Sequence, residues 1–190
     1  MKFFVEIGPC NFDTCVQLAE NGWAGIVCEP HPKFYNDVCQ IYGKYPFVQK
    51  VEAAISDVNG KVSFAPSLTT ELKDGEDWWK QGISHVTSKN HMGTRIKDVG
   101  NNHKLYDEDI WVESMTLNTL LERYKVDQVD YLKIDAEGHE MNILKGYDWD
   151  ILPTVIQLEH WHIDDGAAKA ILEEHGYIVN VEKRDIYAIR

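Results

Sequence analysis

The sequence of 190 residues lacks several features that mark particular classes of protein. It has 19 Lys and Arg against 31 Asp and Glu, a formal charge of -12, and no basic cluster that would favour nucleic acid or an anionic membrane surface. No apolar run reaches the ~20 residues that cross a bilayer. The start MKFFVEIGPC lacks the apolar core and cleavage site of a signal peptide, so we expect a cytoplasmic protein without membrane insertion.

Cysteine and proline are also scarce, with four and six residues respectively. No two of Cys10, Cys15, Cys28 and Cys39 have the C-x-x-C spacing of a zinc or redox site, so we predict small buried apolar side chains rather than metal ligands. The few prolines and 44% hydrophobic residues exclude a disordered chain. The length fits a single domain, residues 1–190, with one main core.

Short apolar segments alternate with segments of helical period along most of the chain. We expect strands over 3–7, 25–28, 47–55, 61–65, 129–134, 154–159, 177–181 and 186–189. We expect helices within 12–22, 34–42, 117–124, 141–146 and 167–176. This alternation predicts an α/β fold with a doubly wound, Rossmann-like, mainly parallel sheet, and the last two strands form an antiparallel pair that makes it mixed.

The stretch at about 66–111 is polar and has no sustained period, so we interpret it as an irregular insertion serving as a lid or binding loop. Trp78 and Trp79 within it could stack on sugar rings, since flat apolar faces match them. A small satellite core that folds the insertion down explains these tryptophans equally well.

Chemistry is expected at the carboxyl ends of the strands, where open α/β sheets bind ligands. The turn EIGPCNFDT has the single Gly8 and lacks both G-x-G-x-x-G and G-x-x-x-x-G-K-[ST], which disfavours NAD, FAD and nucleoside triphosphates. Glu29 follows Gly8 by 21 residues, near the ~20-residue interval of an acid that binds a ribose diol. A ligand with ribose but no pyrophosphate fits, and S-adenosylmethionine is the common one. The alternative is a solvated acid at a strand end.

The segment VDYLKIDAEGHE is the most informative in the chain. Asp135, Glu137 and Glu140 place three carboxylates within six residues after a buried strand, and such like charges repel unless a cation or a proton separates them. They could face a sulfonium, abstract a proton or hold a divalent metal. Alternatively, Glu137 and Glu140 are acids at a helix start, where the helix dipole favours them.

Five segments, EIGPCNFDT, CEPHP, VEAAISDVNG, SMTLNTLL and VDYLKIDAEGHEMNILKG, in this order resemble the FkbM-type S-adenosylmethionine-dependent methyltransferases over nearly the whole chain. The KIDAEGHE block is the specific element. The resemblance implies the class I methyltransferase fold, with a seven-stranded sheet whose last hairpin places one strand antiparallel. It also implies methyl transfer to a hydroxyl of a small molecule, sugar or glycolipid.

Carried over residue by residue, the resemblance assigns cofactor-binding roles along the sheet edge. Glu6 and Gly8 match the first motif, near the methionine end of the cofactor, and Glu29 matches the ribose-binding acid. Glu52 and Ala53 match the turn that contacts adenine.

The same resemblance matches Asp135 to the acid beside the methyl-transfer centre. Asn11, a candidate helix N-cap, is assigned to the cofactor-binding loop. The chain departs from relatives at Cys10 and Phe12, where an Asn and a second Gly are common, so the amino-acid end of the cofactor could be held differently.

We expect Asp135 to accept the proton of the acceptor hydroxyl, with Glu137 or His160 as second candidates. The segment LEHWH, with Glu159, His160 and His162, could join Asp135 in a metal cluster, because His160 and His162 share a side if the preceding strand continues through them. The favoured interpretation is that these histidines line a pocket or satisfy a hydrogen bond in the core. The rival functions are a non-catalytic S-adenosylmethionine-binding or partner-binding domain and a Rossmann-like oxidoreductase or nucleotide-sugar enzyme.

Overall fold

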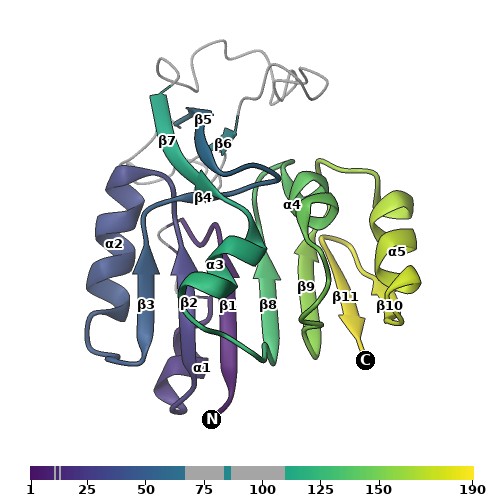
Figure 1. Ribbon diagram of the computed structural model, residues 1–190, viewed down its shortest axis with the longest axis horizontal. Helices are drawn as coiled ribbons and strands as arrows, with labels where there is room; N and C mark the ends of the chain where they lie inside the picture. The colour runs from purple at the N-terminus through teal and green to yellow at the C-terminus, as the bar shows by residue number, and fades with distance from the viewer. Residues whose placement is uncertain (11, 13, 67–83, 87–109) are drawn as a thin grey trace.

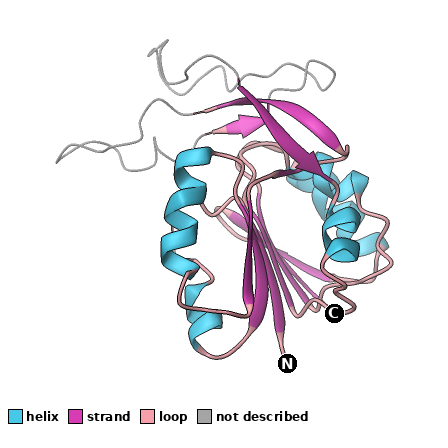
Figure 2. Ribbon diagram, turned by 60° about the vertical axis from the view of Figure 1, so that its left-hand side comes forward, coloured by secondary structure: helices cyan, strands magenta, loops and turns pink. Residues whose placement is uncertain are grey.

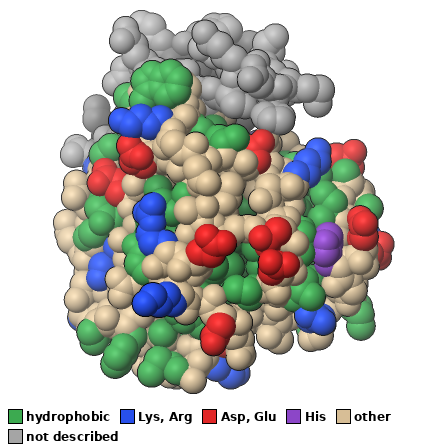
Figure 3. Space-filling model, in the orientation of Figure 1, with side chains coloured by type: hydrophobic (Ala, Val, Ile, Leu, Met, Phe, Trp, Pro, Cys, Tyr) green, Lys and Arg blue, Asp and Glu red, His purple; other side chains and the backbone are tan. Residues whose placement is uncertain are grey.

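The computed structural model describes residues 1–10, 12, 14–66, 84–86 and 110–190. Asn11, Trp78 and Trp79, which the sequence analysis singled out, lie outside these described residues. None of the described helices is long and apolar enough to cross a bilayer. The face seen in Figure 3 carries acidic side chains interspersed with basic ones.

A seven-stranded sheet runs through the molecule in the order β10-β11-β9-β8-β1-β2-β3 (Figure 1). Its strands are β1 (Phe3–Ile7), β2 (Ala24–Cys28), β3 (Val48–Val51), β8 (Tyr131–Ile134), β9 (Val155–Glu159), β10 (Ile178–Val181) and β11 (Asp185–Ile189). Neighbouring strands are parallel except that β11 is antiparallel to both β9 and β10. The predicted doubly wound, mixed sheet of seven strands is therefore confirmed.

Helices cover both faces of this sheet, as Figure 2 shows. They are α1 (Val16–Glu20), α2 (Pro32–Tyr42), α3 (Leu117–Arg123), α4 (Glu140–Gly146) and α5 (Asp165–Glu174). Successive residues of β1 point to opposite faces, so Phe4 packs in the cluster with α1 and α2, while Val5 packs in the larger core with α3, α4 and α5. Burying β1 on both faces explains its uninterrupted apolar start.

Local capping explains where several helices begin. His31 accepts a hydrogen bond from the Lys33 N–H through Nδ1, and Pro32 occupies the first helical position of α2, where no N–H is needed. Thr116 caps α3 in the same way through its hydroxyl oxygen. The first helix begins at Val16, later than its apolar period predicted, and ahead of it the Phe12 N–H donates to the Pro9 carbonyl oxygen in a turn.

A second, four-stranded sheet in the order β4-β7-β5-β6 was not predicted. Its strands are β4 (Ala54–Ile55), β5 (Gly60–Ala65), β6 (His85–Val86) and β7 (Ile110–Met115). The expected strand 47–55 is wrong as a single element, since it divides into β3 and β4, which belong to different sheets. The small sheet stands over the carboxyl ends of the main strands (Figure 1), and so it covers the edge where ligands of such folds bind.

Part of the expected irregular insertion is thus regular structure. The strand β7 starts at Ile110, inside the stretch assigned to the insertion, and pairs with β5 over Gly60–Ser114 to Phe64–Ile110. Its side chains alternate, with Val112 buried and Trp111 exposed. The four cysteines, all within the described residues, form no disulfide, and all but Cys39 are buried, which confirms the prediction of small buried side chains for the other three.

Candidate functional site

A pocket lies at the carboxyl ends of β1, β2 and β8, beneath the small sheet. Its polar side comes from the loops after these strands and includes Gly8, Cys10, Glu29, Asp135, Glu137 and His139. Its apolar side includes Phe34, Ala54, Ile55, Phe64 and Val86. The structure therefore brings four residues that the sequence analysis selected, Gly8, Glu29, Asp135 and Glu137, to one cavity.

Gly8 lies where the loops after β1 and β8 touch. Its backbone is left-handed, with φ of +75°, and its N–H donates to the Cys28 carbonyl oxygen over 2.9 Å. A Cβ atom at this position would lie 1.8 Å from the carbonyl oxygen of Asp135. Only glycine fits there, because any side chain would meet the backbone of the neighbouring loop.

The buried side chain of Glu29 links the loop after β1 to the loop after β2. Its Oε2 accepts from the Cys10 N–H at 2.9 Å and its Oε1 accepts from the His31 N–H at 2.8 Å. Burial raises the pKa of Glu29 to about 7, although these two hydrogen bonds act to lower it. Each carboxylate oxygen can accept a second hydrogen bond, so the group can still receive hydroxyls of a ligand.

Asp135 forms an ion pair with Lys133, whose Nζ lies 3.1 Å from Asp135 Oδ2. Burial alone would lower the pKa of Lys133, but the neighbouring carboxylates of Asp135 and Glu6 raise it, so the amine stays a cation at neutral pH. Asp135 is about one-third exposed and lines the pocket. The Asp135 side chain therefore lines the pocket, while the Lys133 amine that pairs with it lies outside the pocket lining.

Glu6 is fully buried below the pocket rather than in its lining. Its Oε2 accepts from the hydroxyl of Tyr42 at 2.7 Å, and it faces Lys133 across the β1 and β8 pair. Burial raises the pKa of Glu6.

The turn predicted to contact adenine lies only partly at the pocket. Ala53 is buried in the main core, and Glu52 is exposed and borders a separate hollow together with Lys50 and Arg123. The next two residues, Ala54 and Ile55, do line the pocket.

Glu140 is a structural acid at the start of α4. It is buried, and its oxygens accept from the Ala136 N–H at 2.7 Å and the Gly138 N–H at 3.0 Å. Burial raises its pKa to about 7. The interpretation of Glu140 as a helix-start acid agrees with this arrangement.

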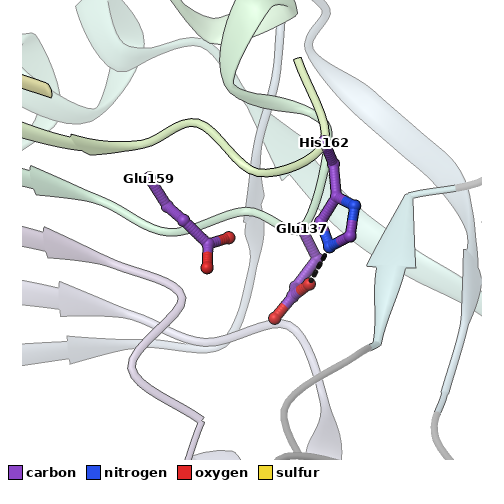
Figure 4. A group of neighbouring side chains, drawn as sticks. All are labelled: Glu137, Glu159 and His162. Atoms are coloured by element: carbon purple, nitrogen blue, oxygen red, sulfur yellow. Dashed lines mark ion pairs between the residues drawn. The ribbon is translucent and has the colours of Figure 1, made fainter. Parts of the chain in front are cut away.

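Glu137, which lines the pocket, forms an ion pair with His162, which is not among the lining residues. Glu137 Oε2 lies 3.3 Å from His162 Nε2, and Figure 4 shows the two side chains pointing toward each other. The backbone of Glu137 is left-handed, with φ of +50°. Burial raises the pKa of Glu137, and the hydrogen bond to Glu137 raises that of His162. Glu159 lies beside them, and burial together with nearby carboxylates, Asp135 first, raises its pKa to about 9.

The strand β9 ends at Glu159, so the strand alternation that would place His160 and His162 on one face does not extend to them. The His160 Nε2 lies 2.7 Å from the Glu182 carbonyl oxygen, in the turn between β10 and β11. His160 is not among the residues that line the pocket. The structure therefore separates His160 from Asp135 and Glu137, the other two residues predicted to be catalytic.

His139 and Phe64 are among the pocket residues that the sequence analysis did not select. His139 lies in the KIDAEGHE segment, and its Nε2 is 2.8 Å from the Ser56 hydroxyl, a contact between loops 83 residues apart. Phe64 comes from the unpredicted small sheet. The position of His139 among the acids of KIDAEGHE could have marked it as a site residue. Nothing in the local sequence indicated that it would contact Ser56.

The buried acids give the fold a distinct dependence on pH. The pKa of both Glu29 and Glu140 is about 7 in the folded protein and ordinary, near 4.5, in an unfolded chain. The folded state therefore holds protons that the unfolded state releases, so the free energy of unfolding falls as pH rises from ~4.5 to ~7. We expect the melting temperature to be about 3–6 °C higher at pH 6 than at pH 8.

Calorimetry of the wild type and of Glu140→Gln checks this expectation. The substituted chain loses one of the buried acids with a raised pKa, so its melting temperature should change less between these pH values than that of the wild type. A wild-type melting temperature that rises from pH 6 to pH 8 would contradict the prediction.

Comparison with known proteins places this fold and pocket in a family. A family model described as "Methyltransferase FkbM domain" matches residues 6–179, which is most of the chain. The chain belongs to the FkbM methyltransferase domain family. The earlier resemblance to FkbM proteins is thereby confirmed, and Gly8, Glu29 and Asp135 all lie within the matched part of this FkbM domain.

A curated relative supports the same family. "Methyltransferase 1" of Beauveria bassiana (strain ARSEF 2860) is 36% identical over an alignment of 101 residues, and the match covers 48% of this chain and 41% of that protein. The match thus spans about two fifths of the length of this relative.

Solved structures similar to this FkbM domain have low sequence identity. Precorrin-6y C5,15-methyltransferase from Geobacter metallireducens GS-15 has a TM-score of 0.49 and 13% identity, and the match covers 98% of this chain and 76% of that one. The Methanococcus jannaschii fibrillarin pre-rRNA processing protein has a TM-score of 0.49 and 11% identity, with 98% and 64% covered.

Proposed function

We propose that this FkbM domain is an S-adenosylmethionine-dependent O-methyltransferase that acts on a hydroxyl of a small molecule, sugar or glycolipid. The observation that carries the proposal is that Glu29 and Asp135 line one pocket at the carboxyl edge of the sheet. The lack of a glycine-rich pyrophosphate motif after β1 agrees with a ligand that has a ribose but no diphosphate.

The residues of the pocket fit this cofactor. Each carboxylate oxygen of Glu29 accepts one backbone N–H and has one lone pair left. The two remaining lone pairs can accept hydrogen bonds from the two hydroxyls of a ribose. The apolar side chains of Phe34, Ile55 and Phe64 suit a flat heterocycle. When bound, the cofactor supplies a methyl group on a positively charged sulfur, which leaves as a neutral thioether when the acceptor oxygen bonds to the methyl carbon.

Asp135 takes the proton that the acceptor hydroxyl releases in this proposal. Its carboxylate faces the pocket, and Lys133 holds it in place from behind, so the group is oriented as well as close. Glu137 is the second candidate, and its ion pair with His162 competes for the same oxygen. We assign no proton transfer to His160, whose ring bonds the Glu182 carbonyl oxygen.

Calorimetry against S-adenosylhomocysteine, S-adenosylmethionine and NAD tests the cofactor. We expect dissociation constants below about 100 μM for the two sulfur ligands and no measurable binding of NAD. NAD binding without a response to either sulfur ligand would refute the proposal. A screen of sugars and glycolipids with labelled cofactor tests the reaction, and binding without any methylated product would favour the non-catalytic alternative.

Replacing Glu29 with glutamine should weaken the binding of S-adenosylhomocysteine about 10- to 30-fold. Glutamine offers only one acceptor oxygen, so one of the N–H groups of Cys10 and His31 would face an NH2 group and the ribose would lose an acceptor. Calorimetry of Glu29→Gln and of the exposed control Glu122→Gln measures the effect. Equal affinities of the two variants would show that Glu29 does not hold the ribose.

A further inference from the structure

Three potential metal ligands from separate segments converge beside the pocket. Glu137 comes from the loop between β8 and α4, Glu159 is the last residue of β9, and His162 lies in the turn before α5. One ligand atom from each lies within 4.8 Å of the other two. Figure 4 shows the Glu159 carboxylate on one side of the Glu137 and His162 pair.

The charges around these three residues are unbalanced. The carboxylates of Asp135 and Glu140 lie close enough to act on Glu159 as well, and Lys133 is the cation that partly offsets them. The Lys133 amine, however, is in contact with Asp135. Within the part of the chain that the structure describes, no hydrogen bond or ion pair reaches the half-buried Glu159 carboxylate, so this group lacks a partner that a cation would supply.

The distances suit one small ion. Ligands at ~2.1 Å from a single ion lie about 3–4 Å from each other in tetrahedral or octahedral geometry. The 3.3 Å between Glu137 Oε2 and His162 Nε2 already falls in this range, and a Glu159 oxygen lies within 4.8 Å of a ligand atom of both residues. An imidazole nitrogen with two carboxylate oxygens favours a transition metal over Mg²⁺ and Ca²⁺, which prefer oxygen ligands alone.

We infer that Glu137, Glu159 and His162 bind one divalent transition-metal ion of the Mn²⁺ to Zn²⁺ series at the acceptor end of the pocket. The binding itself is independent of the proposed function, whereas the role of the ion rests on it. Glu137 lines the pocket together with Asp135, so the ion would lie beside the residue that takes the proton. An ion bound there could hold the acceptor oxygen and would lower the pKa of the acceptor hydroxyl, which would ease the transfer of its proton to a carboxylate such as Asp135.

The chain offers a matched control for this site. His160 and His162 are two residues apart in the same turn, but His160 is bonded to the Glu182 carbonyl oxygen and has no ligand atom in the cluster. We therefore compare His162→Gln and Glu159→Gln with His160→Gln, each without cofactor.

Electron paramagnetic resonance of added Mn²⁺ and calorimetry with Zn²⁺ measure binding in these proteins. The wild type should bind one ion with a dissociation constant below about 100 μM, and His162→Gln and Glu159→Gln should bind at least ~20-fold more weakly. His160→Gln should stay within about twofold of the wild type. Circular dichroism establishes that each variant is folded, and two ligand variants guard against one of them failing to fold.

Three outcomes would overturn the inference. These are no binding of Mn²⁺ or Zn²⁺ below about 1 mM, an equal loss of binding in His160→Gln and His162→Gln, and binding of Mg²⁺ as tight as that of Zn²⁺. Titration with S-adenosylhomocysteine separates this result from the proposed function, because failure of the metal site leaves cofactor binding intact. Conversely, an ion that binds to a protein without affinity for either sulfur ligand would leave the site standing and refute the proposed function.

Discussion

Replacing Gly8 with alanine should weaken the binding of S-adenosylhomocysteine at least ~100-fold and lower the melting temperature. The added Cβ would lie 1.8 Å from the Asp135 carbonyl oxygen, and the backbone φ of +75° already disfavours any residue but glycine. The loops after β1 and β8 would have to move apart. Because Cys10 bonds Glu29 on one loop and Asp135 lies on the other, both sides of the pocket would shift together.

Gly22 supplies the control that separates backbone strain from the clash. Its φ is +82°, close to that of Gly8, but a Cβ there would meet no heavy atom within 4 Å. Gly22→Ala should therefore cost only the left-handed strain, roughly 1–2 kcal/mol of stability, and leave ligand affinity within about twofold. Calorimetric titration measures the ligand affinity of both variants, and thermal unfolding measures their stability. Equal affinities and equal melting temperatures would mean that the close approach of Gly8 to Asp135 is unimportant.

The main sheet could be predicted because its strands are buried and bounded by clear stop signals. The strand β1 is an apolar run that ends at Gly8, and β2 ends before Glu29 and Pro30. The small sheet could not be predicted in the same way. Its strand β4 has two residues, and β5 pairs with β7 across a gap of more than forty residues, so local periodicity carries no trace of the pairing.

The same contrast applies to the pocket. Gly8, Glu29 and Asp135 were found because each directly follows a strand of the parallel sheet, and such ends meet at one edge. The cluster around Glu159 was anticipated in part, since Glu159 and His162 belong to it while His160 and Asp135 do not. Which of the two histidines turns inward depends on where β9 stops and how the next turn runs. Side-chain directions in a turn have no fixed period that a sequence could reveal.

The pairing of Asp135 with Lys133 determines what a substitution at the centre of the pocket would do. Asparagine has nearly the same shape as aspartate and can still accept from the Lys133 amine through its oxygen, so Asp135→Asn should keep the loop in place. It cannot take up a proton from a hydroxyl. We therefore expect Asp135→Asn to bind S-adenosylhomocysteine within about threefold of the wild type and to transfer methyl groups at least ~100-fold more slowly.

Asp127 provides the comparison for this variant, since it is exposed and lies before β8 while Asp135 lies after it. Asp127→Asn should match the wild type in both measurements. The rates come from single-turnover transfer of labelled methyl to the first acceptor that the sugar and glycolipid screen identifies, because a single turnover excludes product release. A rate within about threefold of the wild type would remove Asp135 as the proton acceptor and leave Glu137, the other carboxylate at this end of the pocket, as the group to substitute next.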